Sequence, residues 1–125
     1  MGIVKQRVTL IFGKKRKIVF ALLDTGAETS FIKYSLAKKL GLPKLRKTRA
    51  YIGGTILRPA YETIGSIIID RIRHPIAMMI LADKDLDERF VIGADFMQSG
   101  RIIVNPTTHK LSSVKPKWKY KGFRL

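Results

Sequence analysis

Short apolar segments alternate with turn residues along most of this chain, a pattern that predicts many short strands. Segments 3–12 and 17–23 are rich in β-branched and aromatic residues and flank Gly13, as the two strands of a β-hairpin would. Segments of the same character predict further strands around 48–58, with a bend at Gly53 and Gly54, and at 61–70, 74–82 and 89–93, and a closing hairpin within 101–113. Short strands at this spacing predict an all-β barrel or sandwich.

One stretch, residues 30–43, has the spacing of a helix instead. Apolar residues recur every four positions from Ile32 to Leu40, which would place them on one helical face. Gly41, with a proline close behind it, is a typical helix end. A second short helical turn is expected at 94–100. The predicted fold is therefore all-β with one or two short helices.

Length and composition limit the organisation and the chemistry. At 125 residues the chain has the size of one domain, which we assign to residues 1–112, followed by a basic aromatic tail at 113–125. Cysteine is absent and His74 and His109 are isolated, so we expect no metal ion. No apolar run approaches the roughly 20 residues of a membrane-spanning helix, and the charged N-terminus does not resemble a signal peptide. We therefore expect a soluble, cytoplasmic protein.

The formal net charge of +16 predicts attraction to polyanions such as nucleic acid, an acidic protein or anionic lipid. Most basic residues are spread along the chain, as on an ordinary lysine-rich surface, but two clusters stand apart at 14–17 and 115–124. The second cluster interleaves aromatic residues with cations, as in segments that stack on bases. Its aromatic residues could equally pack on the barrel. Weak binding of nucleic acid is therefore one expectation, carried by the basic surface.

Asp24 directly follows an apolar run, residues 18–23, that predicts a buried strand. Other acidic residues, such as those of 83–88, lie in polar stretches where water solvates them easily. Burying a carboxylate without a partner is costly, so its position makes Asp24 a candidate functional residue. An ordinary strand-to-turn signal, in which Thr25 and Gly26 serve the bend, is the alternative.

Three motifs together resemble those of the retroviral-type, or retropepsin-like, aspartic proteases. L-L-D-T-G-A at 22–27 resembles the active-site loop of that family, and Y-I-G-G-T at 51–55 is similar to its flap hairpin. V-I-G-A-D-F-M at 91–97 resembles the second apolar-Gly motif, which leads into a late helix. The resemblance extends over residues 5–112. It implies a small closed β-barrel with a flap hairpin.

The resemblance also implies an aspartic endopeptidase in which Asp24 is the catalytic residue. Three residues would complete the active-site loop: Thr25, whose hydroxyl would brace it, Gly26 and Ala27. Four would bind substrate: Glu28, Gly53, Gly54 and Ile92. Aspartic proteases use two carboxylates that share one proton, whereas this chain has a single Asp-Thr-Gly. The second carboxylate would come from a second copy, which implies a homodimer acting on a peptide or protein substrate without a cofactor.

Two positions depart from the viral pattern. Glu28 stands where viral members usually have Asp, and Ala94 stands where they usually have Arg, so the ion pair between those positions cannot form. Glu28 would pair with another cation such as Arg7, or reach toward the substrate backbone. The C-terminal hairpin and basic tail also extend beyond the viral length, and in this respect the resemblance is closer to cellular and prokaryotic members than to viral ones. The alternative function is a non-catalytic dimer of the same fold that binds nucleic acid or an acidic protein through its basic surface.

Overall fold

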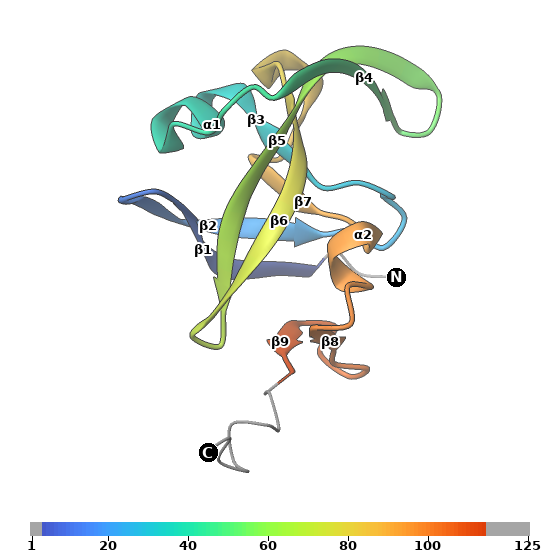
Figure 1. Ribbon diagram of the computed structural model, residues 1–125. Helices are drawn as coiled ribbons and strands as arrows, with labels where there is room; N and C mark the ends of the chain where they lie inside the picture. The colour runs from blue at the N-terminus through green and yellow to red at the C-terminus, as the bar shows by residue number, and fades with distance from the viewer. Residues whose placement is uncertain (1–3, 115–125) are drawn as a thin grey trace.

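The chain begins with an antiparallel hairpin of β1 (Val4–Phe12) and β2 (Lys15–Leu23), whose turn contains Gly13 at a φ of 60° (Figure 1). This computed structural model describes residues 4–114. The other strands are β3 (Phe31–Lys33), β4 (Arg46–Ile52), β5 (Ile56–Ile69), β6 (Ile72–Leu81), β7 (Phe90–Ile92), β8 (Ile102–Val104) and β9 (Leu111–Ser113). The helices are α1 (Tyr34–Leu40), the single 3-10 turn η1 (Asp83–Asp85) and α2 (Ala94–Met97).

Six strands close into a barrel in the order β1-β2-β7-β3-β6-β5, and β1 pairs with β5 to complete the ring. The pairs β2–β7 and β3–β6 are parallel, whereas β1–β2, β5–β6 and β3–β7 are antiparallel. β4 pairs with the first half of β5 and extends this hairpin beyond the ring, and β8 and β9 form a separate hairpin. The predicted closed β-barrel with two short helices is confirmed.

The barrel interior is filled by aliphatic side chains and Phe90, with Ile32, Leu36 and Ile92 fully buried among them. Burial of this kind is the main favourable contribution to folding. A second, smaller cluster lies where the β4–β5 hairpin meets the barrel. It consists of Ala50, Ala60 and Leu81, with Phe31, Ile52, Met79 and Leu86 packed against them.

Of two expectations about individual segments, the bend at Gly53 and Gly54 is confirmed and the helical placement of Ile32 is wrong. The expected bend within 48–58 is present: Gly53 and Gly54 have positive φ values of 61° and 82°, and the chain reverses there to form the β4–β5 hairpin. Ile32 lies in β3 and not in the helix, because it pairs with Ile80 on one side and Phe90 on the other. Sheet pairing on both edges overrides the four-residue spacing there.

The apolar run at 18–23 is a half-buried strand and not a fully buried one. Val19 and Ala21 are buried, whereas Ile18 and Phe20 are 59% and 64% exposed. The side chains of a strand alternate between its two faces, and only one face of β2 points into the barrel.

The helix α1 ends as predicted, at Gly41 in the left-handed conformation with a φ of 72°. Its first turn is held by Asp83, whose Oδ1 accepts a hydrogen bond from the Ser35 N–H at 3.0 Å. That bond lowers the pKa of the Asp83 carboxyl below its usual value. The contact ties η1 to the start of α1.

The β8–β9 hairpin is anchored to the barrel by side chains that bond its backbone. The amide of Gln6 bonds both backbone groups of Leu111, and Asp70 Oδ2 accepts the N–H of Ser113 at 2.9 Å. From residue 115 onward, the predicted basic aromatic tail lies outside the described residues. No helix in the described part of the chain is long and apolar enough to cross a membrane.

Candidate active site

Asp24 is the first residue after β2, at the start of the loop formed by residues 24–30. Because β2 runs parallel to β7, the Asp24 N–H donates to the Ile92 carbonyl at 3.0 Å. Asp24 Oδ1 accepts the Gly26 N–H at 2.9 Å, and the Asp24 carbonyl accepts the Ala27 N–H at 3.1 Å. The carboxylate is thus held by the backbone of its own loop.

The predicted burial of Asp24 is wrong for the single chain, since its side chain is exposed. β2 ends at Leu23, so the carboxylate lies past the strand and outside the barrel interior. Thr25 is exposed as well, and its hydroxyl makes no hydrogen bond to any residue that the structure describes. The predicted bracing of the loop by this hydroxyl within one chain is therefore not observed.

A hydrogen-bond network centred on the buried Ser30 joins the Asp24 loop to α2. Ser30, which is fully buried, accepts the Gly93 N–H at 3.0 Å and donates its hydroxyl to Asp95 Oδ1 at 3.0 Å. The same oxygen of Asp95 accepts the Phe96 N–H at 2.7 Å. Both hydrogen-bond partners of the Ser30 hydroxyl are thus supplied by the second motif, residues 91–97. Neither Ser30 nor Asp95 has a role that the sequence predicts; an acidic residue in the first turn of a helix is the one signal that points to Asp95.

Backbone contacts reinforce the same junction. The Ala94 N–H donates to the Ala27 carbonyl at 2.7 Å, and the Asp95 N–H donates to the Glu28 carbonyl at 3.2 Å. A Cβ on Gly93 would lie 2.5 Å from the Thr29 carbonyl oxygen, closer than real Cβ atoms come to any atom. Only glycine fits there, so the loop and the start of α2 pack backbone against backbone.

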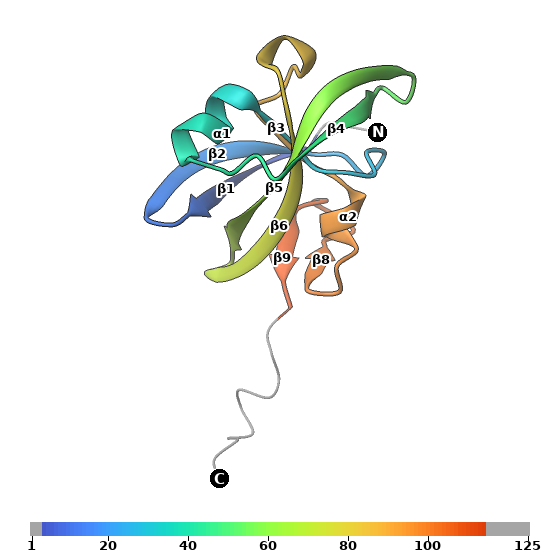
Figure 2. The ribbon, with the colours of Figure 1, turned by 45° about the horizontal axis from the view of Figure 1, so that its top comes forward.

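A cleft of about 820 Å³ opens between the Asp24 loop and the β4–β5 hairpin. In Figure 2 the loop after β2 and the β4–β5 turn lie on the same side of the barrel. Six of the eight predicted site residues line the cleft: Asp24, Gly26, Ala27, Glu28, Gly53 and Gly54. Thr25 does not line it, and Ile92 is fully buried in the barrel core, where its carbonyl bonds Asp24. Ile92 thus does not line the cleft of the single chain, and its role in substrate binding stays a prediction.

The cleft walls contain residues that the sequence analysis did not single out. Apolar walls come from the strands around it, with Leu22, Phe31, Met79, Leu81 and Val91 among the lining residues. The stretch 83–88, expected to be a solvated polar segment, contributes Asp85, Leu86, Asp87 and Glu88. Glu28 makes no ion pair with Arg7 or any other described cation.

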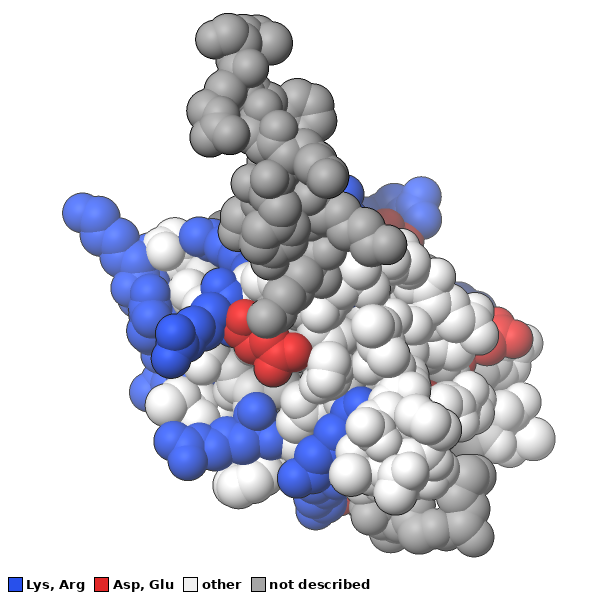
Figure 3. All heavy atoms as spheres, turned by 90° about the horizontal axis from the view of Figure 1, so that it is seen from below, with Lys and Arg blue, Asp and Glu red and all other residues white. Residues whose placement is uncertain are grey.

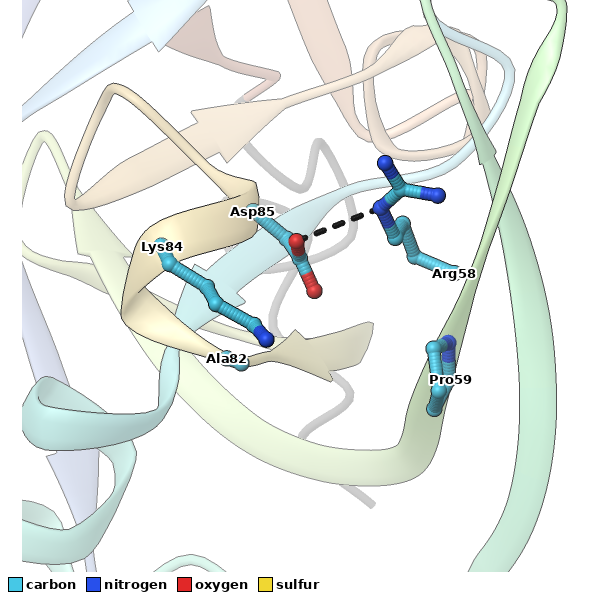
Figure 4. A pocket seen from close by; sticks show the side chains of 5 residues that line it. All are labelled: Arg58, Pro59, Ala82, Lys84 and Asp85. Atoms are coloured by element: carbon cyan, nitrogen blue, oxygen red, sulfur yellow. Dashed lines mark ion pairs between the residues drawn. The ribbon is translucent and has the colours of Figure 1, made fainter.

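A second hollow, of about 600 Å³, lies beside the cleft and is lined by Arg58, Pro59, Ala82, Lys84 and Asp85 (Figure 4). Arg58 comes from β5 and Asp85 from η1, and Nε of Arg58 lies 3.3 Å from Oδ1 of Asp85. The side chain of Asp85 is only 9% exposed, and it also lines the cleft. This ion pair connects the β4–β5 hairpin to the wall of the cleft.

The closed barrel, with an Asp-Thr-Gly loop facing a glycine-tipped hairpin, defines the retropepsin-like class of folds. The chain belongs to the family described as gag-polyprotein putative aspartyl protease, whose model matches residues 11–99. The predicted resemblance is thereby confirmed. No curated protein sequence matches the chain.

Solved structures share this fold at low sequence identity. The retroviral protease-like domain of Ddi1 from Leishmania major is 15% identical with a TM-score of 0.65, covering 93% of this chain and 91% of that one. The EIAV protease is 22% identical with a TM-score of 0.58, covering 78% and 86%. A retropepsin-like aspartic protease from Rickettsia conorii is 16% identical with a TM-score of 0.58, covering 84% and 76%. At these identities the likeness shows the fold alone.

Proposed function

We propose that the chain is an aspartic endopeptidase that hydrolyses peptide bonds as a homodimer. The observation that carries the proposal is the position of Asp24, an exposed carboxylate held by its own loop at a cleft of about 820 Å³. A cleft of this size accommodates several residues of an extended chain. Membership of an aspartyl protease family supports the same reaction.

The reaction would use one Asp24 from each of two subunits. Two carboxylates at short range cannot both ionise, so they share a proton. The ionised group accepts a proton from a water molecule as that water attacks the peptide carbonyl carbon, and the protonated group donates to the carbonyl oxygen. Gly26 and Ala27 hold the loop through their N–H groups. The chain has a single Asp-Thr-Gly, which is the reason for proposing a second copy.

The β4–β5 hairpin would act as a flap over an extended substrate. Extended peptides bind to such sites through strand-like backbone hydrogen bonds, with alternate side chains entering pockets. Gly53 and Gly54 occupy left-handed conformations at the tip of the hairpin, where they impose no side chain on the approaching peptide. Glu28 would lie along the same peptide, at the far end of the Asp24 loop.

The substitution Asp24→Asn tests the catalytic role. It keeps an acceptor for the Gly26 N–H and removes the titratable group, so folding should survive while cleavage falls by at least about a thousandfold. Digestion of an unfolded protein mixture across a range of pH, read by mass spectrometry, would measure cleavage. Asp83→Asn is the matched control, because Asp83 lies outside the cleft. Cleavage by Asp24→Asn at the wild-type rate would remove Asp24 from the mechanism.

Dilution and subunit mixing test the dimer. Activity per chain should fall below the dissociation constant of the dimer, since each subunit supplies half of the site. Adding excess Asp24→Asn chain to a dilute wild-type sample should lower activity further, because mixed dimers contain one titratable carboxylate. Sedimentation would record the oligomeric state. A monomer that cleaves peptides at undiminished specific activity would contradict the proposed half-site.

A second candidate function is binding of nucleic acid or an acidic protein by the basic surface. All four residues of the basic cluster at 14–17 are exposed at the β1–β2 turn. Figure 3 shows Lys and Arg gathered along one side of a face on which Asp and Glu form small patches. Binding that uses several cations should weaken steeply as salt rises. Tight, salt-sensitive binding by a protein that cleaves no peptide at any pH would favour this function over hydrolysis.

A further inference from the structure

The acidic side chains of this basic chain are concentrated in the cleft. The sequence has 9 Asp and Glu against 25 Lys and Arg. Five acidic residues line the cleft: Asp24, Glu28, Asp85, Asp87 and Glu88. Arg49 is the one basic residue among the described lining residues. The charge inside the cleft is therefore opposite in sign to that of the whole chain, and a concave site focuses such a field.

Two of these carboxylates already have cationic partners. Asp85 pairs with Arg58 at 3.3 Å, and Glu88 pairs with Lys5 at 3.1 Å. Glu28 and Asp87 are exposed, and neither forms an ion pair with any cation in the described part of the chain. Apart from Asp24, which the proposed reaction uses, these two residues are the carboxylates free to contact a cationic ligand.

Apolar surface lies beside Asp87, one of the two free carboxylates, and lines the same cleft as Glu28. Leu86, the neighbour of Asp87, packs against the second hydrophobic cluster together with Phe31 and Met79, and all three line the cleft. A side chain that suits this combination has a long aliphatic stem and a positively charged end. Lysine and arginine have that structure, and both bury their stems on apolar surface while the charged group stays at a polar edge.

We infer that the cleft selects extended peptides that carry a Lys or Arg side chain close to the scissile bond, with Glu28 and Asp87 as specificity-determining residues. The inference rests on the proposed function and names its substrate class. The aliphatic stem packs against the wall that contains Leu86, and the cationic end pairs with one of the two free carboxylates. Complementary charges on the enzyme and the peptide contribute more to specificity and to the association rate than to affinity.

A matched pair of peptides tests the inference. The two peptides differ only in whether one position near the cleaved bond is arginine or citrulline, which has nearly the same shape and no charge. We expect kcat/KM of the wild type to favour arginine by about threefold to tenfold, mainly through KM, and the preference to shrink as salt rises. Combining Glu28→Gln with Asp87→Asn should reduce the preference to less than about twofold.

The control is Glu62→Gln, which removes an acidic residue of β5 outside the cleft and should keep the full preference. Glu28 and Asp87 are both exposed, so their neutral replacements leave the folded core intact. Binding of the two peptides to the Asp24→Asn variant, followed by fluorescence anisotropy, gives a second readout that needs no cleavage. A preference for arginine that persists in the double variant would overturn the assignment to Glu28 and Asp87.

The two readouts separate this inference from the proposed function. Equal cleavage of both peptides by the wild type would overturn the substrate class and leave the protease activity standing. Absence of cleavage, together with arginine-selective binding that the double variant loses, would support the substrate class and reject hydrolysis. Absence of cleavage and equal binding would overturn both.

Discussion

The two sides of the cleft are held in place by different means. On one side, the Asp24 loop is fixed to α2 by the buried Ser30 network and by backbone contacts around Gly93 that leave no room for a Cβ. On the other side, the hairpin tip is exposed: Tyr51, Ile56 and Leu57 have 63%, 49% and 38% of their surface accessible. Few buried contacts make a segment easier to open locally, so the hairpin tip should open at a lower free energy than the loop.

This difference implies that mutations on the two sides will affect different quantities. Changes to the loop and α2 should lower the free energy of unfolding, because they disturb buried contacts that form as part of the core. Changes to the hairpin should alter KM and local hydrogen exchange with little effect on global stability. The base of the cleft would thus be preorganised for catalysis while its cover is free to close over a peptide.

The largest effect is expected from Gly93→Ala. The new Cβ would lie 2.5 Å from the Thr29 carbonyl oxygen and 2.7 Å from the Ala27 carbonyl oxygen, so backbone must shift on one side of the junction. We expect a loss of about 3 kcal/mol or more in the free energy of unfolding, measured by urea denaturation.

The comparison variant is Gly54→Ala in the hairpin tip. Gly54 has a φ of 82° but nothing within 4 Å of an added Cβ, so only backbone strain of about 1–2 kcal/mol is expected there. If Gly93→Ala unfolds at the same urea concentration as Gly54→Ala, the two sides of the cleft do not differ in the way described.

Local sequence chemistry was sufficient to predict the parts of the site that depend on consecutive residues. The Asp-Thr-Gly loop, the glycines of the hairpin tip and the end of α1 at Gly41 each follow from residues adjacent in the chain. Ser30 was missed because its role depends on Gly93 and Asp95, more than sixty residues away. A buried serine before a strand has no pattern that distinguishes it from a turn residue.

The acidic wall of the cleft was missed for a related reason. Residues 83–88 have the composition of a solvated loop, and they line the cleft only because β6 ends beside the β4–β5 hairpin. Ile32 was misassigned because sheet pairing with two distant strands outweighs helical spacing. In each case the error concerns contacts between segments that are distant in the sequence, which a single sequence does not record.

The next-largest effect on stability is expected at His74, a residue of β6 that packs against α2. Its ring, 3% exposed, packs edge-on against Phe96 at 6.0 Å, and Nε2 lies 2.7 Å from Ser113 Oγ. The Ser113 hydroxyl donates to the Ile69 carbonyl, so Nε2 is the donor in the histidine contact. Burial, and then the positive charge of Arg101, lower the pKa of His74 below its usual value of 6.5.

A lowered pKa means that the unfolded chain takes up the proton before the folded chain does. The stability that the neutral ring contributes is therefore complete above pH 6.5 and is lost as the pH falls toward the folded pKa. Between pH 7.5 and 5.5 we expect the free energy of unfolding of the wild type to fall, and His74→Gln should abolish this loss. Urea denaturation at both values would measure it, with His109→Gln, an exposed histidine, as the control. Equal pH slopes in the wild type and His74→Gln would contradict this account.

The smallest effect on global stability should come from breaking the ion pair between the hairpin and η1, by either Arg58→Met or Asp85→Asn (Figure 4). The Arg58 side chain is 45% exposed, so solvent screens the pair and global stability should change by less than about 1 kcal/mol. Hydrogen exchange of the hairpin amides should nevertheless become faster, and KM for a cleaved peptide should rise about twofold to fivefold with kcat nearly unchanged.

The reason for expecting a local effect is that this pair joins the hairpin to the rest of the molecule, whereas the pair of Arg46 and Glu62 joins only β4 to β5. Arg46→Met removes a comparable charge and should leave both KM and exchange at the hairpin tip unchanged.

Arg58→Met alone leaves the 9% exposed Asp85 without its partner, so combining it with Asp85→Asn should recover part of any stability loss. Exchange that is equally fast in Arg58→Met and Arg46→Met would show that the hairpin tip is held by contacts other than this ion pair. Faster exchange in the Asp24 loop as well would show that the two sides of the cleft are coupled and not independent.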